Sequence, residues 1–281
     1  MSGPQASKRA IRKGYVDLPG GQLHYRVLGA DNDDPPIVFF HRTPVTSASF
    51  ERVMLELAGW RRMIAFDTPG FGESLWLDDS AGMADFVACF STGLDRLGIA
   101  TCHVVGHHTG AHFAAELAVR HPQRVLSVMI DGAMVAAPAE RPVPPAPPVP
   151  ADLVDSDGDY ARNIWAFLRP YYTQFDPECI HREYVGALGS TFTRQACMAV
   201  VRAHDLAAVL GRITCPLLAS AAQDDVFVAH LAEVERICPQ AQVQVYDSAG
   251  IASPELQTAA FAALVRDMVG LAGDGRVAQS P

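Results

Sequence analysis

The stretch that most constrains this chain is residues 106–110, with the sequence Gly-His-His-Thr-Gly. An apolar run at 102–105 precedes it, and a run with a helical pattern at 111–120 follows it. This layout predicts a strand, a tight turn and a helix. The glycines allow a sharp turn and keep Cβ atoms away from the neighbouring strand and helix. The turn would therefore project His108 from its apex, beside the N–H groups that begin the helix.

Short apolar runs alternate with helical patterns along most of the chain. Strands are predicted at 15–18, 22–28, 37–40, 62–66, 102–105, 125–130, 215–221 and 243–246. Helices are predicted at 47–58, 81–97, 111–120, 228–238 and 254–270. The Gly20-Gly21 pair between the first two strands indicates a β-hairpin. The alternation predicts an α/β fold with a mostly parallel, twisted sheet flanked by helices.

The alternation of apolar runs and helical patterns stops after residue 135. Seven prolines lie within residues 138–150, which is typical of a stiff, extended connector. An aromatic segment with helical pattern follows at about 160–210. We therefore expect disordered tails at 1–14 and 272–281, a core formed by 15–135 and 211–271, and a Pro-rich linker and helical cap inserted at 136–210.

Composition excludes several classes of protein. A formal net charge of -9 and the absence of a dense Lys/Arg run argue against a nucleic-acid partner. No apolar run approaches the roughly 20 residues of a membrane span, so no membrane partner is expected. The N-terminal residues lack the apolar segment of a secretory signal, and the six cysteines are scattered without a C-x-x-C motif. These features predict a cytoplasmic protein with reduced thiols.

Five motifs together make residues 15–271 resemble the α/β-hydrolase superfamily. They are HRTP at 41–44, DTPGFGES at 67–74, GHHTG at 106–110, DDVFV at 224–228 and GI at 250–251. They stand where this superfamily has H-G-x-P, D-x-P-G-x-G-x-S, the nucleophile elbow G-x-S-x-G, the acid turn and a G-H turn. The fourth motif is similar to that of capped carbon–carbon bond hydrolases. The resemblance implies an α/β-hydrolase fold with a helical cap insertion.

The resemblance implies an unusual set of residues at the positions of a Ser-His-Asp triad. The nucleophile position holds His108, and the acid position holds Asp225, with Asp224 as the alternative. The position of the general-base histidine holds Ile251, which cannot move protons. Arg42 replaces the glycine of H-G-x-P. Ordinary serine-esterase chemistry is therefore not expected.

His108 has three open roles. An imidazole titrates near neutral pH and can serve as general base or acid. A neutral imidazole can also attack an acyl carbon and form an acyl-imidazole. His108 could instead contact a ligand without chemistry. Asp225 could orient His108, directly or through a water, or only cap the helix that follows, and Asp131 is an alternative acid.

The remaining expected site residues follow from the same resemblance. The backbone N–H groups of Thr43 and Thr109 occupy the oxyanion-hole positions. The expected substrate-binding residues are His41, Arg42, Ile251, Trp165 and Tyr171. Arg42 could face a substrate carboxylate or enolate, or pair with an acidic neighbour on the surface. The aromatic residues of the cap would favour an apolar substrate.

A metal site is weighed against a structural role for the histidines around the elbow. His107, His108 and His112 lie close in sequence, but there is no H-E-x-x-H carboxylate and the turn interrupts helical geometry. We expect no metal, and His107 is expected to pack beneath the turn. No dinucleotide fingerprint or phosphate loop is present, so no cofactor is expected.

The sequence therefore predicts an atypical hydrolase or lyase. Its substrate would be a small hydrophobic carbonyl compound, such as an ester, a lactone or a diketone-like molecule. Hydrolysis, C–C cleavage, decarboxylation and cyclisation all remain open. The alternative is an inactive pseudo-hydrolase that binds a small hydrophobic ligand. A homodimer is left open as the oligomeric state.

Overall fold

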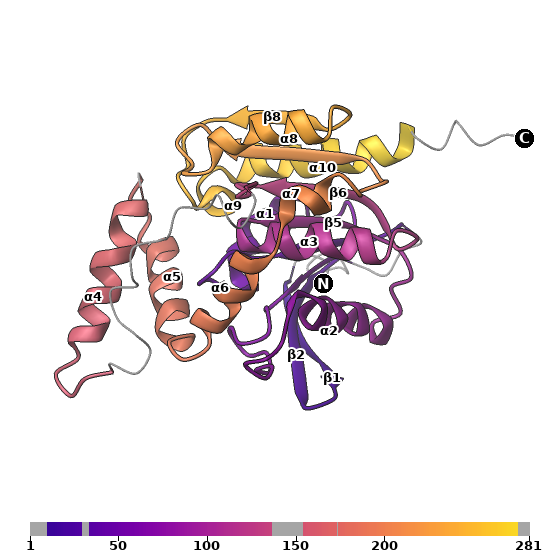
Figure 1. Ribbon diagram of the computed structural model, residues 1–281. Helices are drawn as coiled ribbons and strands as arrows, with labels where there is room; N and C mark the ends of the chain where they lie inside the picture. Colours follow the sequence, from indigo (N-terminus) through magenta and orange to yellow (C-terminus); the bar gives the residue numbers. More distant parts are fainter. Residues whose placement is uncertain (1–9, 30–33, 137–153, 173, 275–281) are drawn as a thin grey trace, which may run out of the picture.

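The computed structural model describes residues 10–29, 34–136, 154–172 and 174–274. Its centre is an eight-stranded sheet with the order β1-β2-β4-β3-β5-β6-β7-β8 (Figure 1). The pairings β1–β2 and β2–β4 are antiparallel, and the others are parallel. The strands are β1 (Arg12–Leu18), β2 (Gly21–Leu28), β3 (Ile37–Phe40), β4 (Met63–Phe66), β5 (Cys102–His107), β6 (Val125–Asp131), β7 (Leu217–Ala222) and β8 (Gln242–Tyr246). The predicted α/β fold with a mostly parallel sheet is confirmed.

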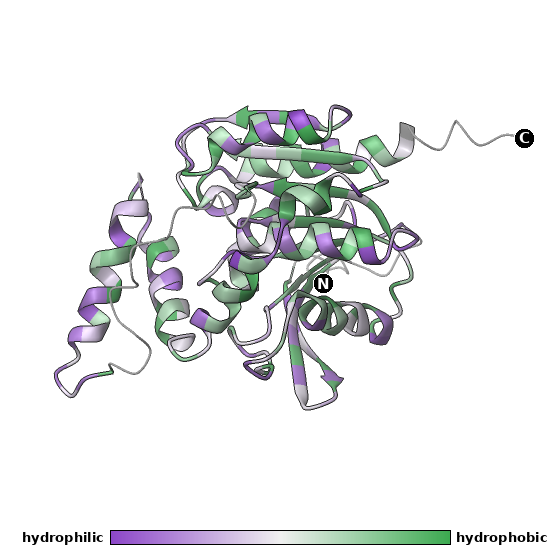
Figure 2. Ribbon diagram, viewed as in Figure 1, coloured by the Kyte–Doolittle hydropathy of each residue, from purple (hydrophilic) through white to green (hydrophobic). Residues whose placement is uncertain are grey.

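The sheet is buried on both faces, which explains its wholly apolar central strands. Alternate residues of a strand point to opposite faces. In β3, Val38 and Phe40 join the apolar cluster that contains Phe90, whereas Ile37 and Phe39 join a second cluster. Figure 2 shows central strands that are mainly hydrophobic, beneath helices of mixed character. Burial on both sides is what a parallel sheet covered by crossover helices requires.

Two layers of helices supply these clusters. Residues of α2, α3 and α8 belong to the cluster on one face, and residues of α1 and α10 belong to the cluster on the other. The helices of the core are α1 (Glu51–Glu56), α2 (Met83–Arg96), α3 (Thr109–Arg120), α8 (Leu231–Ile237), α9 (Ser253–Leu256) and α10 (Thr258–Asp274). Short 3-10 turns, η2 (Ser47–Phe50) and η5 (Val228–His230), begin the helices predicted at 47–58 and 228–238. In the part of the chain that the structure describes, no helix has the length and apolar character needed to cross a membrane.

Among the described residues, four further α-helices lie between β6 and β7. They are α4 (Asp159–Leu168), α5 (Pro177–Gly189), α6 (Arg194–Ala203) and α7 (Leu206–Leu210). Figure 1 shows α4 and α5 standing to one side of the sheet, while α6 and α7 lead back to it. The proline run at 138–150 lies outside the described residues.

The predicted tails are too long at both ends of the fold. β1 begins at Arg12, because its backbone already pairs with Val27 of β2 there. At the other end α10 continues to Asp274, two residues past the predicted start of the tail at 272. Residues 1–9 and 275–281 lie outside the described part of the chain.

Candidate active site

The turn between β5 and α3 places His108 at a strained apex. Its φ is 49° and its ψ is -111°, and among the described residues it is the one non-glycine residue with positive φ. A Cβ on Gly106 would lie 2.5 Å from the Cα of Ala111, so the first glycine is required by the close approach of helix to strand. A non-glycine residue in such a conformation costs about 1–3 kcal/mol and is held by its surroundings.

His108 pairs directly with Asp225. The Nε2 atom of His108 lies 2.7 Å from Oδ2 of Asp225, which follows β7. The His108 side chain is 10% exposed and the Asp225 side chain is fully buried. No hydrogen bond joins Nδ1 of His108 to any residue that the structure describes. With Nε2 bonded to the carboxylate, Nδ1 is left as the nitrogen that can exchange a proton.

Of the two arrangements left open for His108 and Asp225, the structure has the direct contact. Gly132, after β6, leaves the space they use, since a Cβ there would lie 2.8 Å from Oδ2 of Asp225 and still closer to Nε2 of His108. Asp225 also takes the alternative role, because its Oδ1 accepts a hydrogen bond from the backbone N of Phe227 at 2.8 Å. One carboxylate therefore fixes both the imidazole and the turn that follows β7.

The two expected oxyanion donors differ in availability. The backbone N–H of Thr43 donates to Oγ1 of Thr109 at 2.7 Å. The N–H of Thr109 lies in the first turn of α3, where backbone N–H groups lack an acceptor within the helix. The expectation of two open donors is corrected by this geometry, because the Thr109 hydroxyl already occupies the N–H of Thr43.

His41 makes hydrogen bonds within the protein, although it was expected to contact the substrate. Nδ1 of His41 lies 2.8 Å from the backbone O of Arg42, and Nε2 accepts from the N of Thr68. Burial lowers the pKa of His41. Both ring nitrogens are thus used in fixing the loop after β3, which corrects the expected substrate contact.

Arg42 forms a buried bridge between the core and the cap. Its Nη1 and Nη2 donate to Oε1 and Oε2 of Glu183 in α5 at 2.7 and 2.6 Å, and Nη2 also donates to the hydroxyl of Tyr172 at 2.9 Å. Burial opposes the charge of the guanidinium, but Glu183 outweighs it and raises the pKa of Arg42. The partner is acidic, as one alternative expected, yet it is completely buried.

The other expected contact residues lie in the cap and in the turn after β8. Trp165 packs edge-on against Tyr184 with ring centroids 5.3 Å apart, and Tyr171 packs against Phe167. Ile251 is half-buried beside Gly250. Contact of these three residues with a substrate stays a prediction.

Sequence reasoning missed the ring of Phe227 that packs on His108 and the partners of Arg42. Phe227 lies with its ring centroid 5.4 Å from that of His108. Its position two residues after Asp225 was a signal that could have found it. Glu183 and Tyr172 gave no local signal, because they are 141 and 130 residues from Arg42.

A cluster of buried polar side chains lies directly beneath His108 and Asp225. His107 packs edge-on against His108 at 4.7 Å between ring centroids, and Nε2 of His107 lies 3.5 Å from Oδ2 of Asp131. Oδ1 of Asp131 accepts from Ser220 at 2.7 Å and from Tyr246 at 2.8 Å. Burial, reinforced by the charge of Asp225, raises the pKa of Asp131 to about 7. Asp131 therefore lies below the elbow and does not bond His108 through its side chain.

The histidines near the elbow do not form a metal cluster. Nδ1 of His112 lies 3.0 Å from Nδ1 of His204 in the chain between α6 and α7, and Nε2 of His204 lies 3.1 Å from Glu116. Within residues 10–29, 34–136, 154–172 and 174–274, no group of three or more His, Cys, Asp or Glu side chains could hold a metal ion.

Comparison with known proteins relates both the fold and the sequence to hydrolases. The family model described as alpha/beta hydrolase fold matches residues 35–165. The enol-lactonase from Burkholderia xenovorans LB400 has a similar crystal structure, with a TM-score of 0.72 at 22% identity, covering 92% of this chain and all of that one. At this identity the likeness establishes the fold.

Two curated relatives match different lengths of the chain. Over 119 residues it is 48% identical to the dihydrolipoyllysine-residue acetyltransferase component of the acetoin cleaving system of Cupriavidus necator, covering 41% of this chain and 30% of that protein. Over 226 residues it is 28% identical to a putative carbamate hydrolase of Variovorax paradoxus, covering 73% of this chain and 79% of that protein. The chain therefore spans under a third of the length of the first relative.

Proposed function

Because the chain belongs to the α/β-hydrolase superfamily, we propose that it is an enzyme of this fold that acts on a small hydrophobic carbonyl compound without a serine nucleophile. The observation that carries the proposal is the 2.7 Å contact between Nε2 of His108 and Oδ2 of Asp225. It joins an imidazole at the apex of the elbow to a buried carboxylate. This is the pairing that a general base needs in order to stay oriented.

In the proposed mechanism His108 works as a general base through Nδ1. Asp225 holds the proton on Nε2, which leaves the lone pair of Nδ1 for a proton from water or from a carbon next to a carbonyl. The imidazolium that forms is stabilised by the same carboxylate. A positioned base of this kind contributes roughly 10²–10⁴-fold to a rate.

The negative charge that develops on the substrate oxygen would be held at the start of α3. The N–H of Thr109 points from the first helical turn, where the helix dipole also favours an anion. The N–H of Thr43 becomes a second donor when the Thr109 hydroxyl leaves it. Binding of the oxyanion thus requires a rotation of the Thr109 side chain.

The preferred reaction is hydrolysis of an activated ester or a lactone by a water that His108 deprotonates. The similar fold of a protein named enol-lactonase supports a lactone as the first substrate class to test. Proton abstraction beside a carbonyl, leading to C–C cleavage, decarboxylation or cyclisation, uses the same base and the same oxyanion donors.

One observation favours the binding module as the second candidate. The hydroxyl of Thr109 accepts a hydrogen bond from the N–H of Thr43 at 2.7 Å. This hydrogen bond would have to break before the N–H of Thr43 could donate to a substrate oxyanion. A protein that only captured a hydrophobic ligand would not need this donor.

Steady-state turnover of a panel of aryl esters, lactones and β-diketones tests the proposal. We expect His108→Ala to lower kcat/KM by about 10²-fold or more and Asp225→Asn by at least about tenfold, since each removes part of the base. The matched control is His121→Ala, after α3, which should retain the wild-type rate.

The outcomes separate the candidates. Equal turnover by wild type and His108→Ala would refute catalysis by His108. An acyl group on His108, detected by mass spectrometry of the protein with an activated ester, would replace the general base by a nucleophile. Absence of turnover, with thermal stabilisation of both proteins by the same carbonyl compounds, would favour the binding module.

A further inference from the structure

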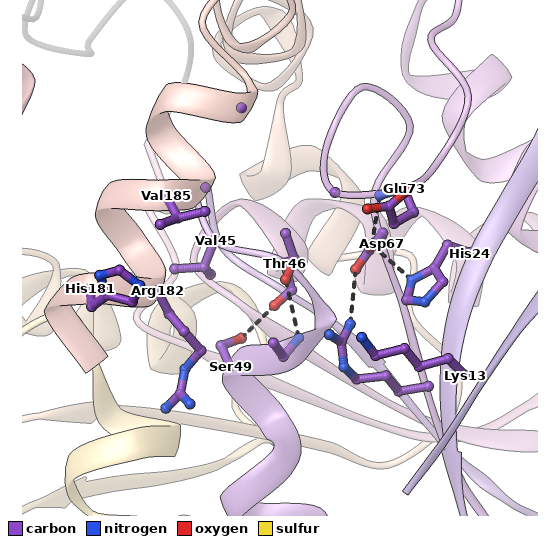
Figure 3. Close-up of a pocket in the computed structure, with 15 residues that line it drawn as sticks. Lys13, His24, Val45, Thr46, Ser49, Asp67, Glu73, His181, Arg182 and Val185 are labelled. Atoms are coloured by element: carbon purple, nitrogen blue, oxygen red, sulfur yellow. Dashed lines mark hydrogen bonds and ion pairs between the residues drawn. The ribbon is translucent and has the colours of Figure 1, made fainter. Parts of the chain in front are cut away.

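A cavity of about 370 Å³ lies between the β1–β2 hairpin and helix α5 (Figure 3). Its walls come from the hairpin, the segment 45–49 that follows the loop after β3, the turn after β4, and α5. Neither His108 nor Asp225 is among its lining residues. The cavity is therefore distinct from the candidate active site, although it shares the loop that carries Thr43.

Two cations face each other across the hairpin at this cavity. Lys13 and Arg26 are direct partners in the antiparallel ladder, and both side chains line the cavity. Figure 3 shows the amino end of Lys13 reaching into the space in front of Asp67. Like charges directly opposite each other in a ladder are destabilising. An anion between them would turn this repulsion into attraction.

Lys13 and Arg26 retain donors for such an anion. The side chain of Lys13 makes no hydrogen bond or ion pair with the residues that the structure describes. In Arg26, Nε donates to Glu51 at 2.7 Å and Nη1 donates to Ser47 at 2.6 Å. Nη2 of Arg26 has no hydrogen-bond partner among the described residues. Both cations that line the cavity therefore keep side-chain donors without a hydrogen-bond partner among the described residues.

Asp67 is a counter-charge for Arg26, whose Nη1 lies 3.7 Å from Oδ1 of Asp67, whereas the Lys13 side chain forms no ion pair with a described carboxylate. Asp67 accepts hydrogen bonds from Nδ1 of His24, from N and Oγ of Ser47 and from N of Glu73. Burial works against its charge, but these hydrogen bonds hold the pKa of Asp67 well below its usual range. The other carboxylate of the lining, that of Glu73, is on an exposed residue at the rim.

A buried, unsatisfied nitrogen also belongs to the cavity wall. His24 is 1% exposed, and its Nε2 has no hydrogen-bond partner among the described residues. Buried polar atoms are rarely left unpaired, and each such atom points to a missing partner. His24 lies two residues before Arg26 on the same face of β2, so one ligand can reach both.

The cap contributes the opposite wall. His181 is exposed and Arg182 is bound through Nε and Nη2 to Oε1 of Glu255, and both lie on the α5 side of the cavity. Figure 3 shows both residues on α5, across the cavity from Lys13 and His24. A ligand in this cavity would therefore touch the core and the cap at once.

We propose that this cavity is a binding site for a small organic anion, whose carboxylate or phosphate oxygens lie between Lys13, Arg26 and His181. The ligand would contact both the hairpin and α5. It would also lie against Val45 and Thr46, which follow Thr43 in the loop after β3. It would stabilise the docked position of the cap without entering the active site. The proposal does not depend on the reaction at His108.

Isothermal titration calorimetry at constant ionic strength tests the site, with citrate and inorganic phosphate as separate probes. We expect saturable 1:1 binding of at least one probe to the wild type. Lys13→Gln should weaken binding by about tenfold, the effect of losing one charge-assisted hydrogen bond. The matched control is Arg12→Gln, which removes the same charge one residue away on the opposite face of β1 and should bind as the wild type does.

Two further variants keep the test decisive. His108→Ala should bind the probe unchanged, whereas His181→Gln should bind it more weakly. Binding of citrate alone would identify a carboxylate site, and binding of phosphate would extend it to phosphate oxygens. The proposal is overturned if neither probe binds saturably, if Lys13→Gln and Arg12→Gln lose affinity equally, or if His108→Ala abolishes binding.

Discussion

Two buried aspartate–histidine pairs lie at the carboxyl ends of neighbouring regions of the sheet, and they are built in opposite ways. Asp67 follows β4 and pairs with His24 of β2 at 2.8 Å. Asp131 ends β6 and faces His107 of β5 at 3.5 Å. All four side chains are almost completely buried, with exposures of 1% or less.

Their hydrogen bonding separates the two pairs. Both carboxylate oxygens of Asp67 are satisfied, and its hydrogen bonds hold the pKa of Asp67 well below its usual range in spite of burial. Oδ2 of Asp131 and both ring nitrogens of His107 have no hydrogen-bond partner among the described residues. Burial accordingly raises the pKa of Asp131 to about 7 and lowers the pKa of His107 well below its ordinary value.

The two pairs differ in how completely their buried polar atoms are hydrogen-bonded. The Asp67 pair closes the turns around β2, β4 and η2, and both of its carboxylate oxygens are paired, which leaves Nε2 of His24 as its one ring nitrogen without a hydrogen-bond partner among the described residues. The Asp131 pair lies under the strained elbow, where unpaired polar groups and an unusual backbone conformation occur together. Such concentrations of strain are typical of functional sites.

The largest expected effect comes from Asp67→Asn. The amide cannot accept as many hydrogen bonds as the carboxylate, and His24 and Arg26 lose their counter-charge. We expect the free energy of unfolding to fall by about 3–5 kcal/mol, as when a buried ion pair loses one partner. Urea denaturation measures it. The free energy of unfolding of Asp79→Asn, at an exposed position, should stay within about 0.5 kcal/mol of the wild-type value. A similar loss in both variants would contradict the stabilising role of the Asp67 hydrogen bonds.

An intermediate, pH-dependent effect is expected for Asp131→Asn. The folded protein keeps the proton of Asp131 up to about pH 7, whereas the unfolded chain loses it near the ordinary value of 3.8. The folded state therefore binds more protons between these values, and this contribution to stability is lost as pH rises. The asparagine side chain of the variant does not titrate.

The measurement for this variant is the free energy of unfolding at pH 5 and at pH 8. Relative to the wild type, Asp131→Asn should gain about 2–3 kcal/mol between the two pH values, at 1.36 kcal/mol per pH unit. Parallel pH profiles for the two proteins would show that Asp131 is ionised throughout this range.

The smallest effect is expected for His107→Leu. The ring of His107 makes no hydrogen bond with the described residues, and it packs edge-on against Phe261 at 6.3 Å. The free energy of unfolding should change by about 1 kcal/mol or less. The matched variant His24→Leu breaks the bond to Asp67 and should cost about 2–3 kcal/mol. A larger loss in His107→Leu than in His24→Leu would reverse the comparison.

The sequence was sufficient for the features that depend on local pattern. The apolar run of β3 predicted a doubly buried strand, and the two glycines around His108 predicted the elbow. The hairpin followed from Gly20 and Gly21. Its register also sets Lys13 opposite Arg26, so the repulsion at the cavity could have been derived from the length of the turn.

Features that depend on side chains far apart in sequence could not be predicted. The direct contact of His108 with Asp225 depends on the space left by Gly132, and the pairing of Arg42 with Glu183 depends on how α5 docks. The hydrogen bond from the N–H of Thr43 to the hydroxyl of Thr109 depends on the rotamer of the Thr109 side chain. Residue types suggested the pairing of His108 with Asp225 but not the partner of Arg42 or the contact of the Thr109 hydroxyl, because the folded distances decide which partner is reached.

The buried bridge from Arg42 to Glu183 and Tyr172 has a consequence for how the molecule comes apart. Peeling α5 away from the sheet would break the two-pronged ion pair of Arg42 with Glu183 and the hydrogen bond of Arg42 to Tyr172 together. We therefore expect α5 to unfold together with the sheet that carries Arg42. A denaturation curve followed by a probe in α5 should coincide with one followed in the sheet, as a single cooperative transition.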